Sequence, residues 1–254
     1  MALTGRYLYG LTRAIGSGDF GSIGLEQAGQ PGRVYPLNAG PVAAIVSEFP
    51  SGEKLLPLRK NLDPHHRVIR EVMRASTIIP MTFGQVANSE TEIVMALREN
   101  LDDILSALEQ LDGKIEMGLK VLWDVDNIFE YFVREDPDLA GFRDQIFGRS
   151  RAPTQAEKVE LGHRFHDKLA IQRERSTERV LAAFEPWVAE VKENPPKGER
   201  MVMNLAFLLD RDLEKKFDEK VCEVAKLFPG EYTFDFSGPW APFNFVELDL
   251  QLAT

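Results

Sequence analysis

The residues best suited to chemistry in this chain of 254 residues are two histidines and a glutamate in a charged stretch. Glu160, His163 and His166 are spaced three apart, so a helix would place them on one face. Imidazole and carboxylate groups at such spacing can bind a metal ion. A solvated polar helix face gives the same pattern, and no cysteine or second ligand cluster supports a closed site. We therefore expect no metal site.

A second candidate is the glycine-rich stretch Gly16-Ser17-Gly18-Asp19-Phe20-Gly21, which matches GxGxxG and follows a predicted strand. A dinucleotide site needs a helix that opens at the third glycine, because the helix N-terminus holds the pyrophosphate. Residues 22–33 carry three more glycines, a proline and few apolar positions, so we expect no helix there. The stretch predicts a flexible surface loop to about Gly32 and no cofactor.

The remaining reactive groups are isolated in the sequence. Cys222 is the only cysteine, which excludes an internal disulfide, and its place on an amphipathic helix predicts a buried, inert thiol. His65 and His66 lie in the first turn of a predicted helix and are interpreted as surface residues. No GxSxG, GxxxxGK or His-Glu-x-x-His motif is present. We therefore assign no catalytic residue.

Composition narrows the class of partner. With 44% hydrophobic and 28% charged residues, the chain is typical of a globular protein. Its formal net charge of -10 argues against nucleic acid or a lipid membrane as the main partner, since both attract basic patches. No apolar run approaches the ~20 residues of a membrane helix, and the first ten residues do not resemble a signal peptide. We expect a cytoplasmic location.

The first part of the chain alternates strands and helices. We predict strands near residues 7–11, 34–37, 42–47 and 79–86. Asp63 followed by Pro64 predicts the start of one helix, and a capping box from Ser89 to Glu92 opens a second, which continues to Asp112-Gly113. These elements predict an α+β N-terminal domain over residues 1–112.

The second part, residues 113–254, predicts a modified ferredoxin-like domain. Strands are expected at residues 115–123, 201–209 and 231–236, and a helix at 127–147 is interrupted at Pro137. Thr154 and Glu157 form a capping box that opens a long helix over about 154–193. A further helix follows Asp210. The order strand, helical insertion, strand, helix, strand suits a sheet with helices on one face.

An aromatic C-terminal segment, Ser237 to Gln251, follows the last predicted strand. So much apolar surface must be buried against its own domain or against a partner. We select Trp240, Phe243 and Phe245 as candidate partner contacts. The alternative is that these side chains complete the core of the second domain.

Several phrases along the chain resemble one known family. They are Tyr7-Leu8-Tyr9-Gly10, VAAIVSE at residues 42–48, Asn61-Leu62, IPMTFG at 79–84, GLKVLWD at 118–124 and GPWAPFNFV at 238–246. In this order they resemble the gas vesicle protein F/L family (GvpF/GvpL) over nearly the whole chain. Thr82 departs from the basic residue expected in the family's phrase, and the second histidine after Pro64 departs from an expected glutamate.

The resemblance implies an α+β N-terminal domain followed by a modified ferredoxin-like domain, with no catalytic residues and no cofactor. It also implies an accessory or minor structural protein of gas vesicles that associates with the main, very apolar shell protein and possibly other gas vesicle accessory proteins. Its expected location is the gas vesicle and the cytoplasm. The alternative function is a cytosolic enzyme or ligand-binding module on a ferredoxin-like scaffold, since that scaffold supports many activities.

Overall fold

The protein forms two compact units, each with its own β-sheet. The structure, a computed structural model, describes residues 4–16, 18–50, 55–248 and 250. The first unit takes in the chain up to Glu116 and again from Pro239 onward, and the second runs from Met117 to Gly238. The mixture of helices and two sheets confirms the predicted α+β class. The predicted division falls between residues 112 and 113 and places the aromatic segment in the second domain. The two units instead divide after Glu116, and the aromatic segment groups with the first unit.

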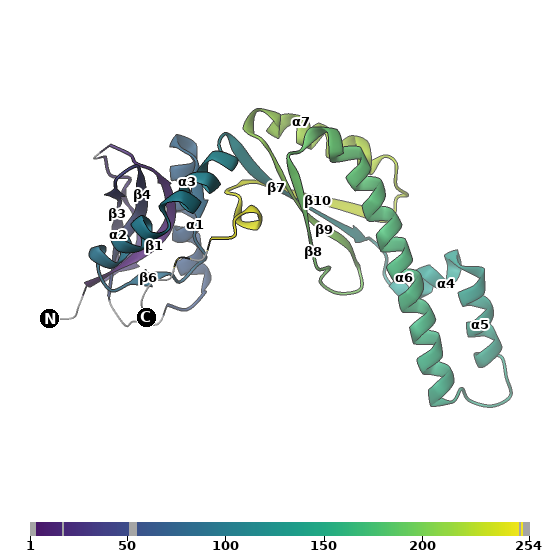
Figure 1. The fold of residues 1–254 in the computed structure, drawn as a ribbon. Helices are drawn as coiled ribbons and strands as arrows, with labels where there is room; N and C mark the ends of the chain where they lie inside the picture. Colours follow the sequence, from purple (N-terminus) through teal and green to yellow (C-terminus); the bar gives the residue numbers. More distant parts are fainter. Residues whose placement is uncertain (1–3, 17, 51–54, 249, 251–254) are drawn as a thin grey trace. The chain divides into compact units, whose positions relative to one another are not determined.

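The first unit is an antiparallel sheet with helices on both faces (Figure 1). Its strands follow the order β2-β3-β4-β1-β5, and β6 also pairs with β1. In chain order its elements are β1 Thr4–Arg13, β2 Gly21–Gln27, β3 Gln30–Ala39, β4 Val42–Pro50, α1 Arg59–Ala75, β5 Ile78–Pro80, β6 Val86–Ala87, α2 Glu90–Glu99, α3 Leu101–Gln110 and the short 3-10 helix η3 Phe243–Phe245.

Strand β1 pairs with β4 along one edge and with β5 and β6 along the other, and it is buried on both faces. Tyr7 and Tyr9 point toward α1, where both rings contact His65. Arg6, of the opposite parity, reaches Glu90 of α2 with Nε to Oε1 at 3.0 Å. Alternate residues of a strand point to opposite faces, so α1 covers one face and α2 the other. This explains why Leu8 is as fully buried as the tyrosines beside it.

The predicted loop to about Gly32 is wrong, because residues 21–27 form strand β2. Gly24 lets the backbone of β2 pass close to the Tyr9 side chain, since a Cβ at this position would lie 2.6 Å from the Tyr9 hydroxyl. The backbone N–H of Leu25 donates to the same hydroxyl at 2.9 Å. Glycine marks a close backbone contact here rather than a loop. The expected absence of a helix after Gly21 is confirmed, and Ser17 lies outside the described residues.

Two predicted helix boundaries also need correction. Helix α1 begins at Arg59, and Pro64 lies inside it. Because proline has no N–H, the carbonyl of Lys60, four residues earlier, lacks its helical hydrogen bond. Lys60 is exposed, so water can donate to that carbonyl instead. The helix predicted after Ser89 is two helices, α2 and α3, divided at Asn100, whose side-chain amide donates to the Ala96 carbonyl.

The strand predicted at residues 79–86 is also divided. Its two parts are β5 and β6, and the turn between them contains Gly84 at a φ of 98°. Glycine adopts this backbone conformation without the steric cost that a Cβ would bring. The chain can therefore turn between two short strands that both pair with β1.

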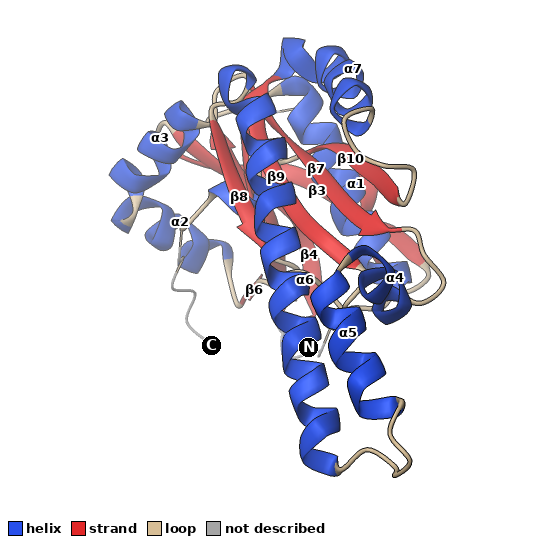
Figure 2. Cartoon of the chain, turned by 90° about the vertical axis from the view of Figure 1, so that its right-hand side faces the viewer, coloured by secondary structure: helices blue, strands red, loops and turns tan. Residues whose placement is uncertain are grey.

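The second unit has the βαββαβ order of a ferredoxin-like fold. Its sheet order is β10-β7-β9-β8, with helices α6 and α7 beside the sheet (Figure 2). Its elements are β7 Lys114–Trp123, α4 Ile128–Glu135, α5 Pro137–Phe147, α6 Gln155–Phe184, η1 Glu185–Trp187, β8 Glu190–Asn194, β9 Met201–Asp210, η2 Arg211–Leu213, α7 Glu214–Ala225 and β10 Tyr232–Trp240. The first three residues of β7 and the last two of β10 count with the first unit.

The helix predicted over 154–193 ends at Phe184, and residues 190–194 form edge strand β8. Pro186 contributes to this end because it has no N–H to donate to the carbonyl of Ala182, and the chain continues from Glu185 to Trp187 as the 3-10 helix η1. The strand pairs with β9 from Glu190 opposite Leu208 to Asn194 opposite Asn204. It supplies the fourth strand, which the sequence analysis missed. The start of the helix is as predicted, with a complete capping box at Thr154 and Glu157.

Helices α4, α5 and the first half of α6 form a helical arm that extends past the sheet (Figure 1). The break predicted at Pro137 is confirmed, because α4 ends at Glu135 and α5 begins at Pro137. Phe165 of α6 holds the base of the arm together, with ring centroids 5.4 Å from Phe129 and 5.7 Å from Phe132. Within the described chain, no helix is both long and apolar enough to cross a lipid bilayer.

Candidate functional site

The aromatic segment starts at the end of β10 and continues through η3. Strand β10 is longer than predicted and includes Trp240, whose side chain is 41% exposed. Ala241 is buried directly after it, while Phe243 and Phe245 are half-buried. The three candidate contacts therefore have different environments. Asp249 and Gln251, near the end of this segment, are not among the described residues.

A buried carboxylate fixes the position of η3. Glu116 of β7, only 6% exposed, accepts the backbone N–H of Asn244 at 2.9 Å and its side-chain amide at 2.6 Å. Burial raises the pKa of the Glu116 carboxyl, and the two hydrogen bonds from Asn244 oppose that rise. Hydrogen bonds to an ionised acceptor are among the stronger ones in proteins. The segment is therefore held in a defined conformation.

His66 of α1 contacts the same segment. Its ring meets Phe243 edge to face, with centroids 6.2 Å apart and an interplanar angle of 79°. Of the predicted surface pair, only His66 is exposed. Phe243 thus packs within the first unit, while Trp240 keeps a larger exposed fraction.

His65 is buried, contrary to the prediction that it lies at the surface. It is 1% exposed, and its Nδ1 lies 2.8 Å from the Tyr7 hydroxyl. That hydroxyl also accepts the backbone N–H of Gly84 at 3.1 Å. Burial lowers the pKa of His65 to about 4, and the neighbouring His66 adds to the effect. The helical spacing carried a signal for this burial, because His65 lies three and four residues before Val68 and Ile69 on the buried face of α1.

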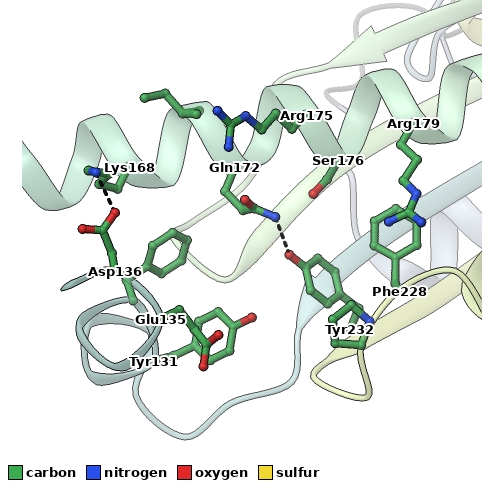
Figure 3. Close-up of a pocket in the computed structure, with 13 residues that line it drawn as sticks. Tyr131, Glu135, Asp136, Lys168, Gln172, Arg175, Ser176, Arg179, Phe228 and Tyr232 are labelled. Carbon is green, nitrogen blue, oxygen red and sulfur yellow. Dashed lines mark hydrogen bonds and ion pairs between the residues drawn. The ribbon is translucent and has the colours of Figure 1, made fainter. Parts of the chain in front are cut away.

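A groove of about 610 Å³ lies in the second unit between α4, α6 and the start of β10 (Figure 3). Gln172 and Ser176 point from α6 toward Tyr232, and Gln172 donates to the Tyr232 hydroxyl at 3.1 Å. Lys168 closes one end through an ion pair with Asp136 at 2.6 Å. This pairing lowers the pKa of Asp136 and raises that of Lys168, so both stay charged.

The sequence analysis singled out none of the residues that line this groove. The sequence does contain a pattern for one wall of the groove. A spacing of three and four residues places four polar side chains on one side of a helix: Lys168, Gln172, Arg175 and Arg179. It could not be separated from a solvated charged face without knowing that α4 packs beside α6.

The candidate metal ligands do not come together as a site. Among the described residues, no group of three histidine, cysteine, aspartate or glutamate side chains could hold a metal ion. Glu160 instead accepts from Arg164 at 2.8 Å, and His166 lies 4.0 Å from Glu199. Cys222 is exposed, so the predicted burial of its thiol is wrong.

The architecture defines the class of protein: an α+β chain whose second sheet has the ferredoxin-like order and carries a helical arm. Residues 5–247 match the family model described as Gas vesicle synthesis protein GvpL/GvpF. The chain belongs to this family, which confirms the resemblance seen in the sequence. The family description names gas vesicle synthesis and no enzymatic reaction.

Individual relatives agree with the family match. Gas vesicle protein F of Streptomyces sp. (strain CB03234) is 29% identical over 248 residues, covering 95% of this chain and 99% of the relative. Gas vesicle protein L of the same organism is 27% identical over 262 residues, covering 95% and 92%. The crystal structure of GvpF from Anabaena sp. PCC7120 has a TM-score of 0.83 at 25% identity, covering 97% of this chain and 99% of that one.

Proposed function

We propose that this protein binds the main gas vesicle shell protein and assists nucleation, assembly or growth of the vesicle. Family membership supports an association with gas vesicles. The observation that carries the finer proposal is Trp240, which is 41% exposed at the start of a segment that Glu116 holds in place. The contact surface is Trp240 with Phe243 and Phe245.

The physical need for such a binder follows from the partner. A shell subunit with a strongly apolar surface tends to aggregate before it assembles, because exposed apolar area is unfavourable in water. An aromatic segment that is already ordered loses little conformational entropy when it binds. The net charge of -10 opposes self-association of the complex through charge repulsion.

We further propose that the protein works by binding and catalyses no reaction. The groove in the second unit is lined by no histidine or cysteine. His65 is buried against Tyr7, while His163 and His166 are exposed on α6. We place the protein in the cytoplasm and at the gas vesicle, where other gas vesicle accessory proteins are further candidate partners.

Co-purification with the shell protein tests the contact surface. Trp240→Ala together with Phe243→Ala should reduce the recovered shell protein roughly tenfold, since buried aromatic anchors dominate interface energies. Phe147→Ala is the matched control, because Phe147 is 55% exposed on α5 and belongs to the second unit. Circular dichroism establishes that each variant is folded. Equal recovery with the folded double variant and wild type would remove the aromatic segment from the proposal.

This protein can bind the shell protein transiently during assembly, or it can remain in the vesicle wall as a minor component. Washing purified vesicles with urea of increasing concentration and probing for this protein distinguishes the two. Retention after washes that remove surface proteins supports a wall component. Complete loss in the mildest wash supports transient assistance.

A further inference from the structure

The groove between α4, α6 and the start of β10 carries unpaired positive charge on an acidic protein. Its cations come from α6: Lys168, Arg175 and Arg179. Lys168 is paired with Asp136. Among the described residues, neither Arg175 nor Arg179 has a carboxylate within ion-pair distance, and both are exposed. Arg179 instead lies over the Phe228 ring, 5.1 Å from its centroid (Figure 3).

The acidic residues of the opposite wall, Glu135 and Asp136, each have a basic partner. Asp136 is bound to Lys168, and Glu135 accepts from Arg134 at 3.0 Å. Tyr131, on the same helix α4, has a pKa raised to about 12 by burial, with Tyr232 and nearby carboxylates adding to the rise. Its hydroxyl therefore remains protonated and able to donate. The groove offers two guanidinium groups and hydroxyl donors to an incoming anion.

The spacing of the two arginines suits an extended chain. They are four residues apart, which corresponds to a rise of about 6 Å along α6. Side chains on one face of an extended strand repeat every two residues, or about 6.7 Å. From Lys168 to Arg179 the groove wall runs about 16 Å along the helix, the length of roughly five extended residues. A compact anion would occupy only part of this length.

The groove also offers apolar contacts between its charges. Ile171, which is 43% exposed, lies between Lys168 and Arg175 on the α6 wall. Phe228 and Pro229 line the other side, which the residue between two carboxylates of an extended segment would face. Arginine pairs with carboxylates through two parallel hydrogen bonds, which favours aspartate and glutamate over a diffuse negative surface. We propose that the groove binds an extended acidic segment of a partner polypeptide, with carboxylates at alternate positions on Arg175 and Arg179 and an apolar residue between them.

This site goes beyond the function proposed above and does not depend on it. The aromatic segment belongs to the first unit, whereas every residue that lines the groove belongs to the second. A negative result at either place leaves the other proposal standing.

A direct test uses a fluorescein-labelled peptide of eight residues with two glutamates separated by one leucine and otherwise glycine and serine. Fluorescence anisotropy with the full chain should show saturable binding that weakens as salt is added. A peptide of the same composition with adjacent glutamates should bind several-fold more weakly, because only one carboxylate can reach an arginine at a time.

Arg175→Gln with Arg179→Gln should weaken binding roughly tenfold or more, because two charge-assisted contacts are lost. Arg67→Gln with Arg70→Gln is the matched control, since it removes the same charge from exposed positions of α1 in the first unit. Both double variants should keep the wild-type circular dichroism spectrum. Equal binding by the two double variants would overturn the proposal.

Hydrogen exchange locates the bound peptide independently of any substitution. Protection should appear at α4 and at the start of β10, the two elements that face α6 across the groove. Protection confined to the first unit would overturn the assignment. Displacement of the peptide by an equal concentration of inorganic phosphate would also overturn it, because the groove would then prefer a compact anion.

Discussion

The two units of this protein differ in the kind of side chain that each offers as a candidate binding surface. The first unit buries polar groups, His65 against Tyr7 and Glu116 against Asn244, and leaves Trp240 partly exposed. The second unit buries aromatic rings, among them Trp123, at its core, and lines a groove with exposed arginines. One acidic chain therefore offers an apolar surface and a cationic one. Salt should weaken binding at the second far more than at the first.

The largest expected effect on stability in this comparison comes from His65, the buried histidine of the first unit. The pKa of His65 is about 4 in the folded chain against 6.5 in the unfolded one, so only the unfolded chain gains this proton as the pH falls from 6.5 to 4. The stabilising contribution is complete above pH 6.5. About 3 kcal/mol of unfolding free energy should be lost by pH 4.

Urea unfolding at a series of pH values measures this loss. His65→Asn keeps a polar partner for Tyr7 but does not titrate, so its stability should fall less across the same window. His66→Asn, at the exposed neighbour, should retain the wild-type slope. If His65→Asn and wild type lose the same free energy between pH 6.5 and 4, the histidine is not buried as described.

The next effect concerns the anchor of the aromatic segment. Glu116→Ala leaves the backbone and side-chain N–H groups of Asn244 without their acceptor, which should cost about 2 kcal/mol of unfolding free energy. It should also reduce shell-protein recovery, because the segment loses its fixed conformation. Glu99→Ala, on the exposed side of α2, should change neither quantity. Normal shell-protein recovery with folded Glu116→Ala would show that the anchor is not needed for binding.

The smallest effect lies at the end of the groove. Asp136 binds Lys168 and also caps α5 by accepting the backbone N–H of Leu139 at 2.9 Å. Asp136→Ala should cost about 1 kcal/mol, most of it from the lost cap. Asp136→Asn retains the cap and should cost less. Thermal unfolding compares the two variants, and an equal loss from both would assign the stability to the ion pair.

Local sequence signals predicted those elements whose ends have chemical markers. The capping box at Thr154, the break at Pro137 and the alternation in residues 115–123 each specify backbone geometry without help from distant residues. The βαββαβ order was incomplete because Pro186 was not used to end α6. The helix predicted to residue 193 therefore included the first four of the five residues of β8.

The candidate site was less accessible because its contacts are distant in the sequence. Glu116 and Asn244 are 128 residues apart, and no local pattern joins them. Strand β2 was not predicted because the reason for Gly24 is a distant contact. Its lack of a Cβ makes room for the hydroxyl of Tyr9, fifteen positions earlier in the chain. The aromatic segment was identifiable by composition alone, but its grouping with the first unit depends on such long-range contacts.

The most direct measurement is the affinity of purified shell protein for wild type and for the Trp240→Ala, Phe243→Ala variant, each at low and high salt. The apolar contact predicts that the variant binds roughly tenfold more weakly at both salt concentrations. Equal affinities for variant and wild type, or binding that salt alone abolishes, would contradict the proposed role of the aromatic segment.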